Sequence, residues 1–281
     1  MQIWYNIIDA LALPFMEYTF MKNALLCVIL ITPILGLLGT MVVSRGMSFF
    51  SDSLGHSAFT GIALGTLLGL RQPVWAMVLF GILFAVALIL VKGKNTASTD
   101  TTIGVFSASA ISLGLLLISR GQGVAKYSGF LVGDILSVSP TDLLLLFLAA
   151  VLVLIYWCVD YNKLSLLSVN ESLSVSRGVR KNRIEITFAV AVAVIVMLSI
   201  PWVGVLLINA LLVLPAAAAR NVAHTCRSYT VLSVIIALLC GIGGLLLSYP
   251  LDAAPGTVIT LLAAVVYFIT FMPGASEKRG A

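Results

Sequence analysis

The chain contains, at residues 141–158, the sequence TDLLLLFLAAVLVLIYWC, in which Asp142 carries the only charge. A bilayer is crossed by a helix of about 20 mostly apolar residues, whereas barrel strands are alternating segments of about 10 residues. Further helix-length apolar segments occupy approximately residues 20–44, 52–70, 73–92, 101–119, 184–200, 202–219, 229–249 and 256–272. The sequence therefore predicts an all-α fold, a polytopic transmembrane helix bundle with about eight or nine spans.

The composition supports an integral membrane protein. Of the 281 residues, 60% are hydrophobic and 10% are charged, and the mean hydropathy is +1.13. Soluble domains carry about 25% charged residues. No polar stretch is long enough for a soluble domain, and no GxxxxGK[ST] motif for nucleotide phosphates is present. We therefore expect a chain that is not an enzyme, and its net charge of +5 gives no indication of nucleic-acid binding.

The domain organisation follows from the same segments. Residues 1–19 are expected to form an interfacial segment rather than a cleavable signal peptide, because they lack the positively charged amino-terminal region of a signal peptide and include Asp9 and Glu17. Residues 20–272 form the membrane domain, with a polar cytoplasmic loop at about 160–183, and residues 273–281 form a cytoplasmic tail. Small residues within the spans predict close helix packing; examples are Gly36, Gly39, Gly61, Gly65, Gly241 and Gly244.

The distribution of basic residues predicts the orientation. If nine segments cross and the carboxyl terminus is cytoplasmic, four of the 16 lysines and arginines remain outside: Lys22, Arg71, Arg120 and Lys126. The others face the cytoplasm, as the positive-inside rule requires. A re-entrant segment in the amino-terminal half would reduce the count to eight. The four cysteines form no CxxC pair, so we expect reduced thiols rather than disulfides or a cysteine metal site.

Asp52 and His56 are the first candidate site. They lie in the sequence SDSLGHSA, at residues 51–58, and the chain has only two histidines. On a helix, residues four apart share a face, so a carboxylate and an imidazole there supply two ligands for zinc, manganese or iron. Ionisable groups inside spans are costly and mark transport pathways. The alternative is a helix cap beside a histidine that bonds to a neighbouring carbonyl.

Two other residues are candidate ligands. Asp252 lies between two spans in the sequence SYPLDAAPG, and it is either a ligand or a turn aspartate before Pro255. With nine spans, Asp52 and Asp252 begin at opposite membrane faces, so they share a site only if helix breaks bring them to a common depth. Asn209, within an apolar run, either supplies an amide oxygen or makes an interhelical hydrogen bond.

The polar segment at 160–183 is the second candidate site. Its sequence NESLSVSRGVRKNR, at residues 170–183, is basic and compatible with a short helix that Gly178 ends. Such a segment either docks a cytoplasmic partner or is a solvated loop near charged lipid.

Four stretches together resemble the zinc, manganese and iron permeases of bacterial ABC importers, the ABC-3 family. They are SRGMSFFSDSLGHSAFTGIALG at 44–65, GFLVGDILSVS at 129–139, VGVLLINALLVLPAAAAR at 203–220 and SYPLDAAPG at 248–256. Residues 170–178 resemble the coupling segment of the family, with Glu171, Ser174 and Gly178 as the expected ATPase-coupling residues. The sequence departs from the pattern at Asn209, where Ser or Thr is expected in relatives.

The resemblance implies a permease subunit in the bacterial cytoplasmic (inner) membrane. Two copies form the pathway, two ATPase subunits dock on the cytoplasmic side and bind ATP, and an extracytoplasmic solute-binding protein delivers the metal. Asp52 and His56, with Asp252, then ligate the ion inside the pathway, and the chain binds no cofactor of its own. Zinc is favoured, then manganese or iron.

Two other functions remain open from the sequence. The first is an ATP-independent, proton-coupled metal transporter or channel, although the spans hold few acidic groups for a proton relay and show no inverted repeat. The second is an ABC permease for haem or a siderophore, which calls for a wide apolar pathway rather than an Asp/His pair.

Overall fold

The computed structural model describes residues 18–92, 98–119 and 129–277. Most of the predicted interfacial segment 1–19, and residues 278–281 of the predicted tail, lie outside these ranges. Residues 273–277 continue the last helix.

Within the described residues the secondary structure is entirely helical, which confirms the predicted fold class. The short elements are α7 (Gly129–Val132), η2 (Ile135–Ser137) and α9 (Glu171–Ser176). The long helices match the predicted apolar segments closely. They are α2 (Thr19–Ser44), α3 (Phe50–Leu67), α4 (Pro73–Lys92), α5 (Thr99–Ser119), α8 (Pro140–Val169), α10 (Lys181–Val203), α11 (Val205–Val222), α12 (Cys226–Ser248) and α13 (Pro255–Glu277).

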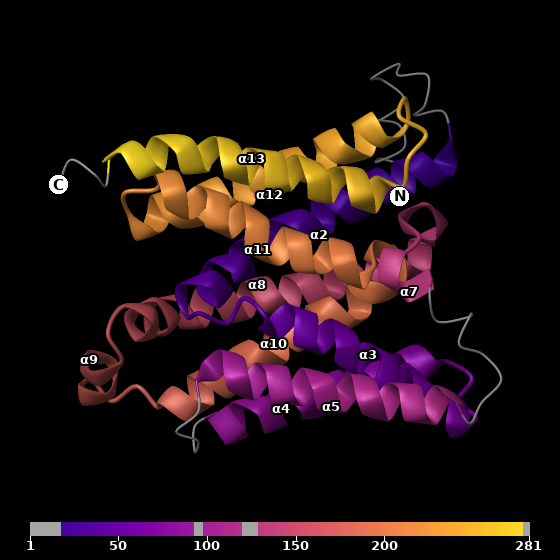
Figure 1. Ribbon diagram of the computed structural model, residues 1–281, viewed down its shortest axis with the longest axis horizontal. Coiled ribbons are helices and arrows are strands. Elements are labelled where there is room, and N and C mark those ends of the chain that lie inside the picture. Colours follow the sequence, from indigo (N-terminus) through magenta and orange to yellow (C-terminus); the bar gives the residue numbers. More distant parts are fainter. Residues whose placement is uncertain (1–17, 93–97, 120–128, 278–281) are drawn as a thin grey trace.

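Seven of the described helices are long and apolar enough to cross a membrane, namely α2, α4, α5, α8, α10, α11 and α12. The apolar part of α13, Pro255–Phe271, is slightly shorter. The α3 helix is less apolar because it contains Asp52, His56 and several serines, yet it packs alongside α4 and α5 within the bundle (Figure 1). A helix with this many polar groups needs protein neighbours rather than lipid around it.

The long helices form two groups joined through the centre (Figure 1). In one group α2 packs against α11, α12 and α8, and α13 packs against α11 and α12. In the other group α3 packs against α4 and α5, and α10 packs against α4. The two groups are connected by the contacts of α10 with α8 and α11 and by the contact of α11 with α3.

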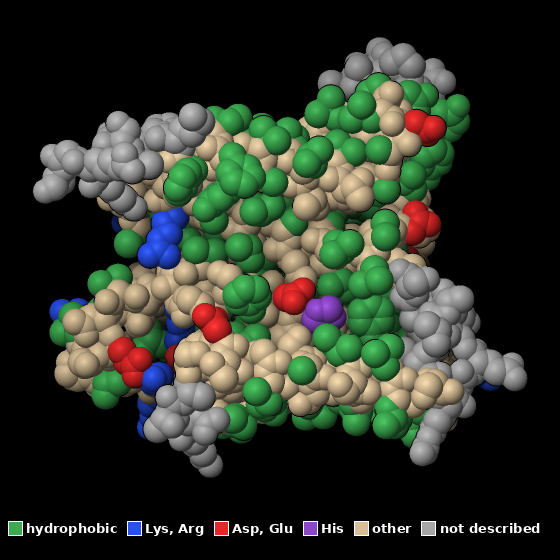
Figure 2. Space-filling model, in the orientation of Figure 1, with side chains coloured by type: hydrophobic (Ala, Val, Ile, Leu, Met, Phe, Trp, Pro, Cys, Tyr) green, Lys and Arg blue, Asp and Glu red, His purple; other side chains and the backbone are tan. Residues whose placement is uncertain are grey.

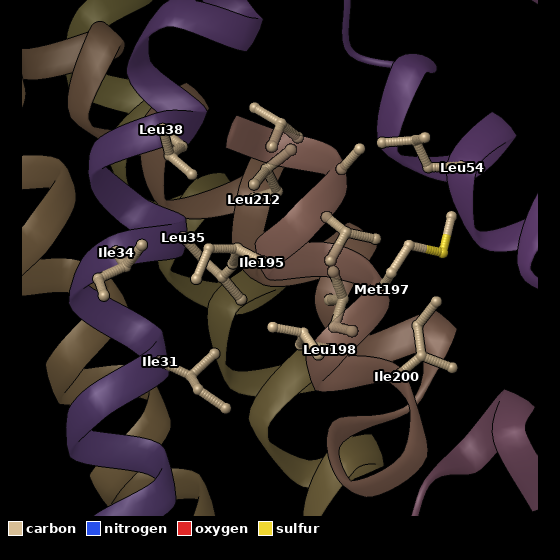
Figure 3. Close-up of a cluster of buried hydrophobic side chains, with 14 of the residues drawn as sticks. Ile31, Ile34, Leu35, Leu38, Leu54, Ile195, Met197, Leu198, Ile200 and Leu212 are labelled. Carbon is tan, nitrogen blue, oxygen red and sulfur yellow. The ribbon is translucent and has the colours of Figure 1, made fainter. Parts of the chain in front are cut away.

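Buried side chains from α2, α3, α10 and α11 meet at the centre of the molecule. Figure 3 shows Leu35 and Leu38 of α2 close to Leu212 of α11, with Leu54 of α3 on the other side of the cluster. These side chains are at most 4% exposed. Leu54 points away from Asp52 and His56 on α3, because residues two apart on a helix lie on different faces, so its burial fixes the rotation of α3 within the bundle.

Small residues permit this close packing, as predicted. A Cβ atom added to Gly39 of α2 would lie 2.0 Å from the carbonyl oxygen of Leu212 in α11, and one added to Gly36 would lie 2.9 Å from that of Ser233 in α12. The Ser233 hydroxyl donates to the Gly36 carbonyl at 2.6 Å, a hydrogen bond between helices. Close van der Waals contact and such bonds hold membrane helices together, because lipid supplies no hydrophobic drive between them.

The charged side chains distinguish the two ends of the bundle. Most Lys and Arg side chains in view lie at the left-hand end in Figure 2, where α9 and the carboxyl-terminal end of α13 also lie (Figure 1). The positive-inside rule predicts that this end faces the cytoplasm, and it is called the cytoplasmic end below. The α7 and η2 elements lie at the opposite, extracytoplasmic end.

The loop expected from residue 160 is partly helical. The α8 helix begins with a capping box, in which Ser139 and Asp142 cap each other's backbone, and continues through 160–169 to Val169. Asp160 and Lys163, three residues apart, form an ion pair at 2.7 Å on this extension. The polar composition predicts a loop here, whereas the helix continues beyond the apolar segment, where an ion pair three residues apart supports it.

Candidate metal-ligand cluster

The α3 helix places its polar side chains inside the bundle. It starts after a tight turn at 45–49, in which Gly46 has a φ of +62°, and Ser51, Ser53, Ser57 and Thr60 are completely buried. The Thr60 hydroxyl donates to the Ala110 carbonyl of α5 at 2.6 Å. These four hydroxyl side chains are therefore surrounded by protein.

Asp52 and His56 meet on one face of α3, as their spacing predicts. The Nε2 atom of His56 lies 3.3 Å from Oδ2 of Asp52, and their side chains are 30% and 47% exposed. Asp52 lies in the first helical turn, where the helix dipole stabilises a negative charge. Figure 2 shows a histidine side chain beside an acidic side chain near the middle of this face.

Asn209 of α11 completes the cluster. Its Nδ2 donates to Oδ1 of Asp52 at 2.8 Å, although the two residues are 157 positions apart. Its own Oδ1 is buried and has no hydrogen-bond partner among the described residues. If the Asn209 amide were reversed, its oxygen would face an oxygen of the Asp52 carboxylate. The carboxylate therefore favours the orientation in which the amide nitrogen faces Asp52 and the amide oxygen has no partner.

Two glycines bring α11 to this position. Gly204, with a φ of +82°, forms the turn between α10 and α11, and a conformation with such a φ is strained for other residues. Gly55 of α3 has no side chain where α11 begins, and a Cβ there would lie 2.3 Å from Cγ1 of Val205. This close approach of α3 and α11 places Asn209 beside Asp52.

The cluster presents a mixed set of donors to a cation. The carboxylate and the imidazole lie together on α3 and remain accessible, and the Asn209 amide of α11 holds one carboxylate oxygen while its own oxygen is buried without a partner among the described residues. Oxygen and nitrogen ligands suit zinc, manganese and ferrous iron. Because only three donors are present, an incoming ion keeps part of its hydration shell, and the arrangement is suited to weak, reversible binding.

The structure does not bring Asp252 to this cluster. It lies exposed in the connection from α12 to α13, at the extracytoplasmic end, with a φ of +47° in the left-handed region that Asp tolerates. In Figure 1 this connection lies at the right-hand end, away from the start of α3. Among the described residues, no group of three His, Cys, Asp or Glu side chains is positioned to hold a metal. Of the four unpaired cysteines, Cys27 and Cys240 are buried and Cys158 and Cys226 are exposed.

The predicted coupling residues lie in and after α9, at the cytoplasmic end. Asn170 caps this helix by accepting from the Leu173 amide at 2.9 Å. Glu171 is exposed and forms an ion pair with Lys181, whereas Ser174 is completely buried and donates to the Glu171 carbonyl at 2.7 Å. Gly178, with a φ of +79°, ends α9 as its sequence position predicts.

A buried ion pair at the cytoplasmic end was not predicted. Arg45, in the turn before α3, bonds to Glu185 in the second turn of α10, and each side chain is only 6% exposed. Burial lowers the pKa of Arg45, and the Glu185 carboxylate opposes this shift. One indication of this pair was available in the sequence, namely the acidic residue Glu185 at the start of the apolar segment 184–200. Through Lys181 and Glu185, α10 connects α9 to the turn that precedes the cluster.

Comparison with known proteins identifies relatives along nearly the whole chain. The family model "ABC 3 transport family" matches residues 17–274. The manganese import system permease protein ScaB of Streptococcus parasanguinis is 31% identical over 94% of this chain and 94% of its own length. The high-affinity zinc uptake system membrane protein ZnuB of Haemophilus influenzae is 32% identical over 88% of this chain and 95% of its own.

A solved structure shares the fold. PsaBC from Streptococcus pneumoniae, in complex with a Fab, superimposes with a TM-score of 0.80 at 29% identity and covers 96% of this chain and 95% of the other. With the seven apolar helices, these similarities make the chain a multi-pass membrane protein.

Proposed function

The chain belongs to the ABC 3 transport family, and we propose that it is the permease subunit of an ATP-binding-cassette importer that moves a divalent metal ion into the bacterial cytoplasm. The observation that carries this function is the convergence of Asp52, His56 and Asn209 on the central helices α3 and α11. Relatives that import manganese and zinc support this class of cargo.

The three donors have separate roles in the proposed pathway. Asp52 supplies the charge that attracts the ion, and His56 supplies a nitrogen ligand that discriminates against calcium and magnesium, which prefer oxygen. The Asn209 amide orients Asp52 and offers its free oxygen. Asp252, exposed at the extracytoplasmic end, is proposed to meet the ion earlier, where it enters.

Zinc is the favoured cargo, followed by manganese and iron. For a given set of nitrogen and oxygen ligands, zinc binds more tightly than manganese or ferrous iron. A solute-binding protein on the extracytoplasmic side is proposed to deliver the ion already selected, so the cluster itself needs only to accept and release it.

ATP is proposed to act through partners. Two copies of the chain form the pathway, and an ATPase subunit docks on α9 of each copy. Movement of α9 then reaches α10 through the Glu171–Lys181 pair and the turn before α3 through the Arg45–Glu185 pair. This route connects the ATPase surface to the helix that holds Asp52 and His56.

Whole-cell metal content tests the function. A strain lacking the chain is supplied with the wild type, His56→Ala or His224→Ala, and its zinc, manganese and iron are measured. His224 is the matched control, because it is exposed in the connection between α11 and α12. We expect the wild type and His224→Ala to restore one metal and His56→Ala to fail while the complex still assembles. Equal restoration by all three would remove His56 from the pathway.

The ATP-independent alternative is distinguished by the purified chain alone. In vesicles with a proton gradient and no ATPase subunit, a proton-coupled transporter or a channel moves metal, and an ABC permease does not. Metal movement under these conditions would replace the importer proposal.

A further inference from the structure

A groove of about 440 Å³ lies between α8 and α12, near the cytoplasmic end of the bundle. It is lined by Trp157, Cys158, Tyr161, Asn162, Arg227, Thr230 and Val231. Both helices pack against α2. Its volume is within the range of about 300–1,000 Å³ that is usual for small-molecule sites.

The depth of the groove coincides with the inner surface of the bilayer. Trp157 follows Pro140, at the extracytoplasmic end of α8, by 17 residues, which is about 26 Å along a helix. The hydrocarbon core is about 30 Å thick. Trp157 and Tyr161, whose ring centroids are 5.5 Å apart, therefore lie where aromatic residues border the headgroups.

The groove combines an apolar wall with an uncompensated positive charge. Trp157 is 6% exposed, and Val231 of α12 is 56% exposed and faces outward. Arg227, in the first turn of α12, is exposed and forms no ion pair with the described residues, whereas the nearby Lys163 is paired with Asp160. Arg227 is the only charged residue of the lining.

We propose that this groove binds an anionic phospholipid of the inner leaflet. The phosphate lies against Arg227 and the first turn of α12, where the helix dipole also favours an anion. Asn162 supplies a further donor, and one acyl chain follows the apolar wall between α8 and α12. A second copy of the chain is the other possible occupant, and the measurements below distinguish it from a lipid.

Native mass spectrometry of the detergent-purified full chain tests the headgroup preference. Phosphatidylglycerol and phosphatidylcholine with identical acyl chains are added separately. We expect phosphatidylglycerol to be retained preferentially, Arg227→Ala to reduce that preference about fivefold, and Arg227→Lys to keep part of it. Arg183→Ala is the matched control, since Arg183 is an exposed arginine at the same end of the bundle. An unchanged preference in Arg227→Ala would overturn the proposal.

Cys158 provides an independent measurement inside the groove. The other exposed cysteine is Cys226, and Cys27 and Cys240 are buried, so Cys226→Ser leaves Cys158 as the reactive thiol. We expect phosphatidylglycerol, and not phosphatidylcholine, to slow maleimide labelling in this variant. Equal slowing by both lipids would mean unselective lipid contact. Slowing that depends on protein concentration and not on lipid would assign the groove to a second copy.

Discussion

Asn209 controls the position of Asp52 in this account. Its amide holds one carboxylate oxygen at 2.8 Å and leaves the other for His56 and the ion. We expect Asn209→Ala to lower the apparent affinity of metal uptake at least tenfold, since loss of a residue that orients a ligand costs about 10–100-fold. Uptake is measured against metal concentration in cells that carry each variant.

Asn221→Ala is the control for this substitution, because Asn221 lies on the same helix and bonds weakly to Thr270 at 3.4 Å. We expect it to transport like the wild type. An Asn209→Ala variant with wild-type uptake at every metal concentration would contradict the role given to the amide.

The ligand cluster could be predicted only in part from the sequence. The spacing of Asp52 and His56 was sufficient to predict that their side chains meet, because residues four apart on a helix lie on the same face. Asn209 remained ambiguous because its position beside Asp52 depends on the contact of Gly55 with Val205 between two helices. Asp252 was also a candidate ligand from its local sequence. The topology of the bundle places it at a different depth from Asp52, and the local sequence alone does not reveal that depth.

We expect the buried Arg45–Glu185 pair to contribute to stability as well as to the proposed communication between α9 and α3. Removing one partner of a buried ion pair leaves an uncompensated charge, which costs about 3–5 kcal/mol. We therefore expect Arg45→Ala or Glu185→Ala to lower the thermal unfolding temperature of the purified chain markedly. The double variant Arg45→Met/Glu185→Leu is expected to recover much of the loss while transport stays impaired. Single variants that unfold at the wild-type temperature would show that the pair is not buried.

At the level of helices, the contact between α2 and α11 supports the cluster. Gly39 has no space for a side chain, because a Cβ atom would lie 2.0 Å from the Leu212 carbonyl oxygen. We expect Gly39→Ala to destabilise the chain by about 1–3 kcal/mol and to reduce uptake, since α11 carries Asn209. Thermal unfolding and metal uptake are measured together.

Gly104→Ala is the matched control on α5, where an added Cβ atom meets no atom within 4 Å. There the substitution is expected to be neutral or to stabilise the helix by up to about 1 kcal/mol. Equal effects of the two variants would indicate that α2 and α11 do not approach closely.

The short helix α9 depends on its terminal glycine. Gly178 adopts a φ of +79°, which costs other residues about 1–2 kcal/mol. We expect Gly178→Ala to disorder the end of α9 and to reduce co-purification of the ATPase subunit, with Gly129→Ala, which has open space around it, as the control. Normal co-purification with normal transport would remove α9 from the docking surface.

Helix positions were predicted better than helix ends. The apolar segments correspond to the long helices within a few residues, because hydrocarbon thickness sets their length. The extension of α8 to Val169 was missed, since beyond the membrane a helix depends on local pairs such as Asp160–Lys163 and no longer on hydropathy.

At the level of the whole molecule, the proposed function assigns three tasks to different positions along its length. The basic cytoplasmic end holds α9 and the Arg45–Glu185 pair, the centre holds Asp52 and His56, and the extracytoplasmic end exposes Asp252. A permease that passes an ion from an outer donor to the cytoplasm under control of an inner ATPase requires this order.

ATP-dependent zinc transport by the reconstituted complex tests the central claim most directly. The wild type, His56→Ala and His224→Ala are each assembled with the ATPase subunits and the solute-binding protein in vesicles, and transported zinc is measured. We expect ATP-dependent uptake by the wild type and His224→Ala, and at least a tenfold loss with His56→Ala despite normal assembly. Equal uptake by all three complexes would contradict the claim that the ion passes through the Asp52–His56 cluster.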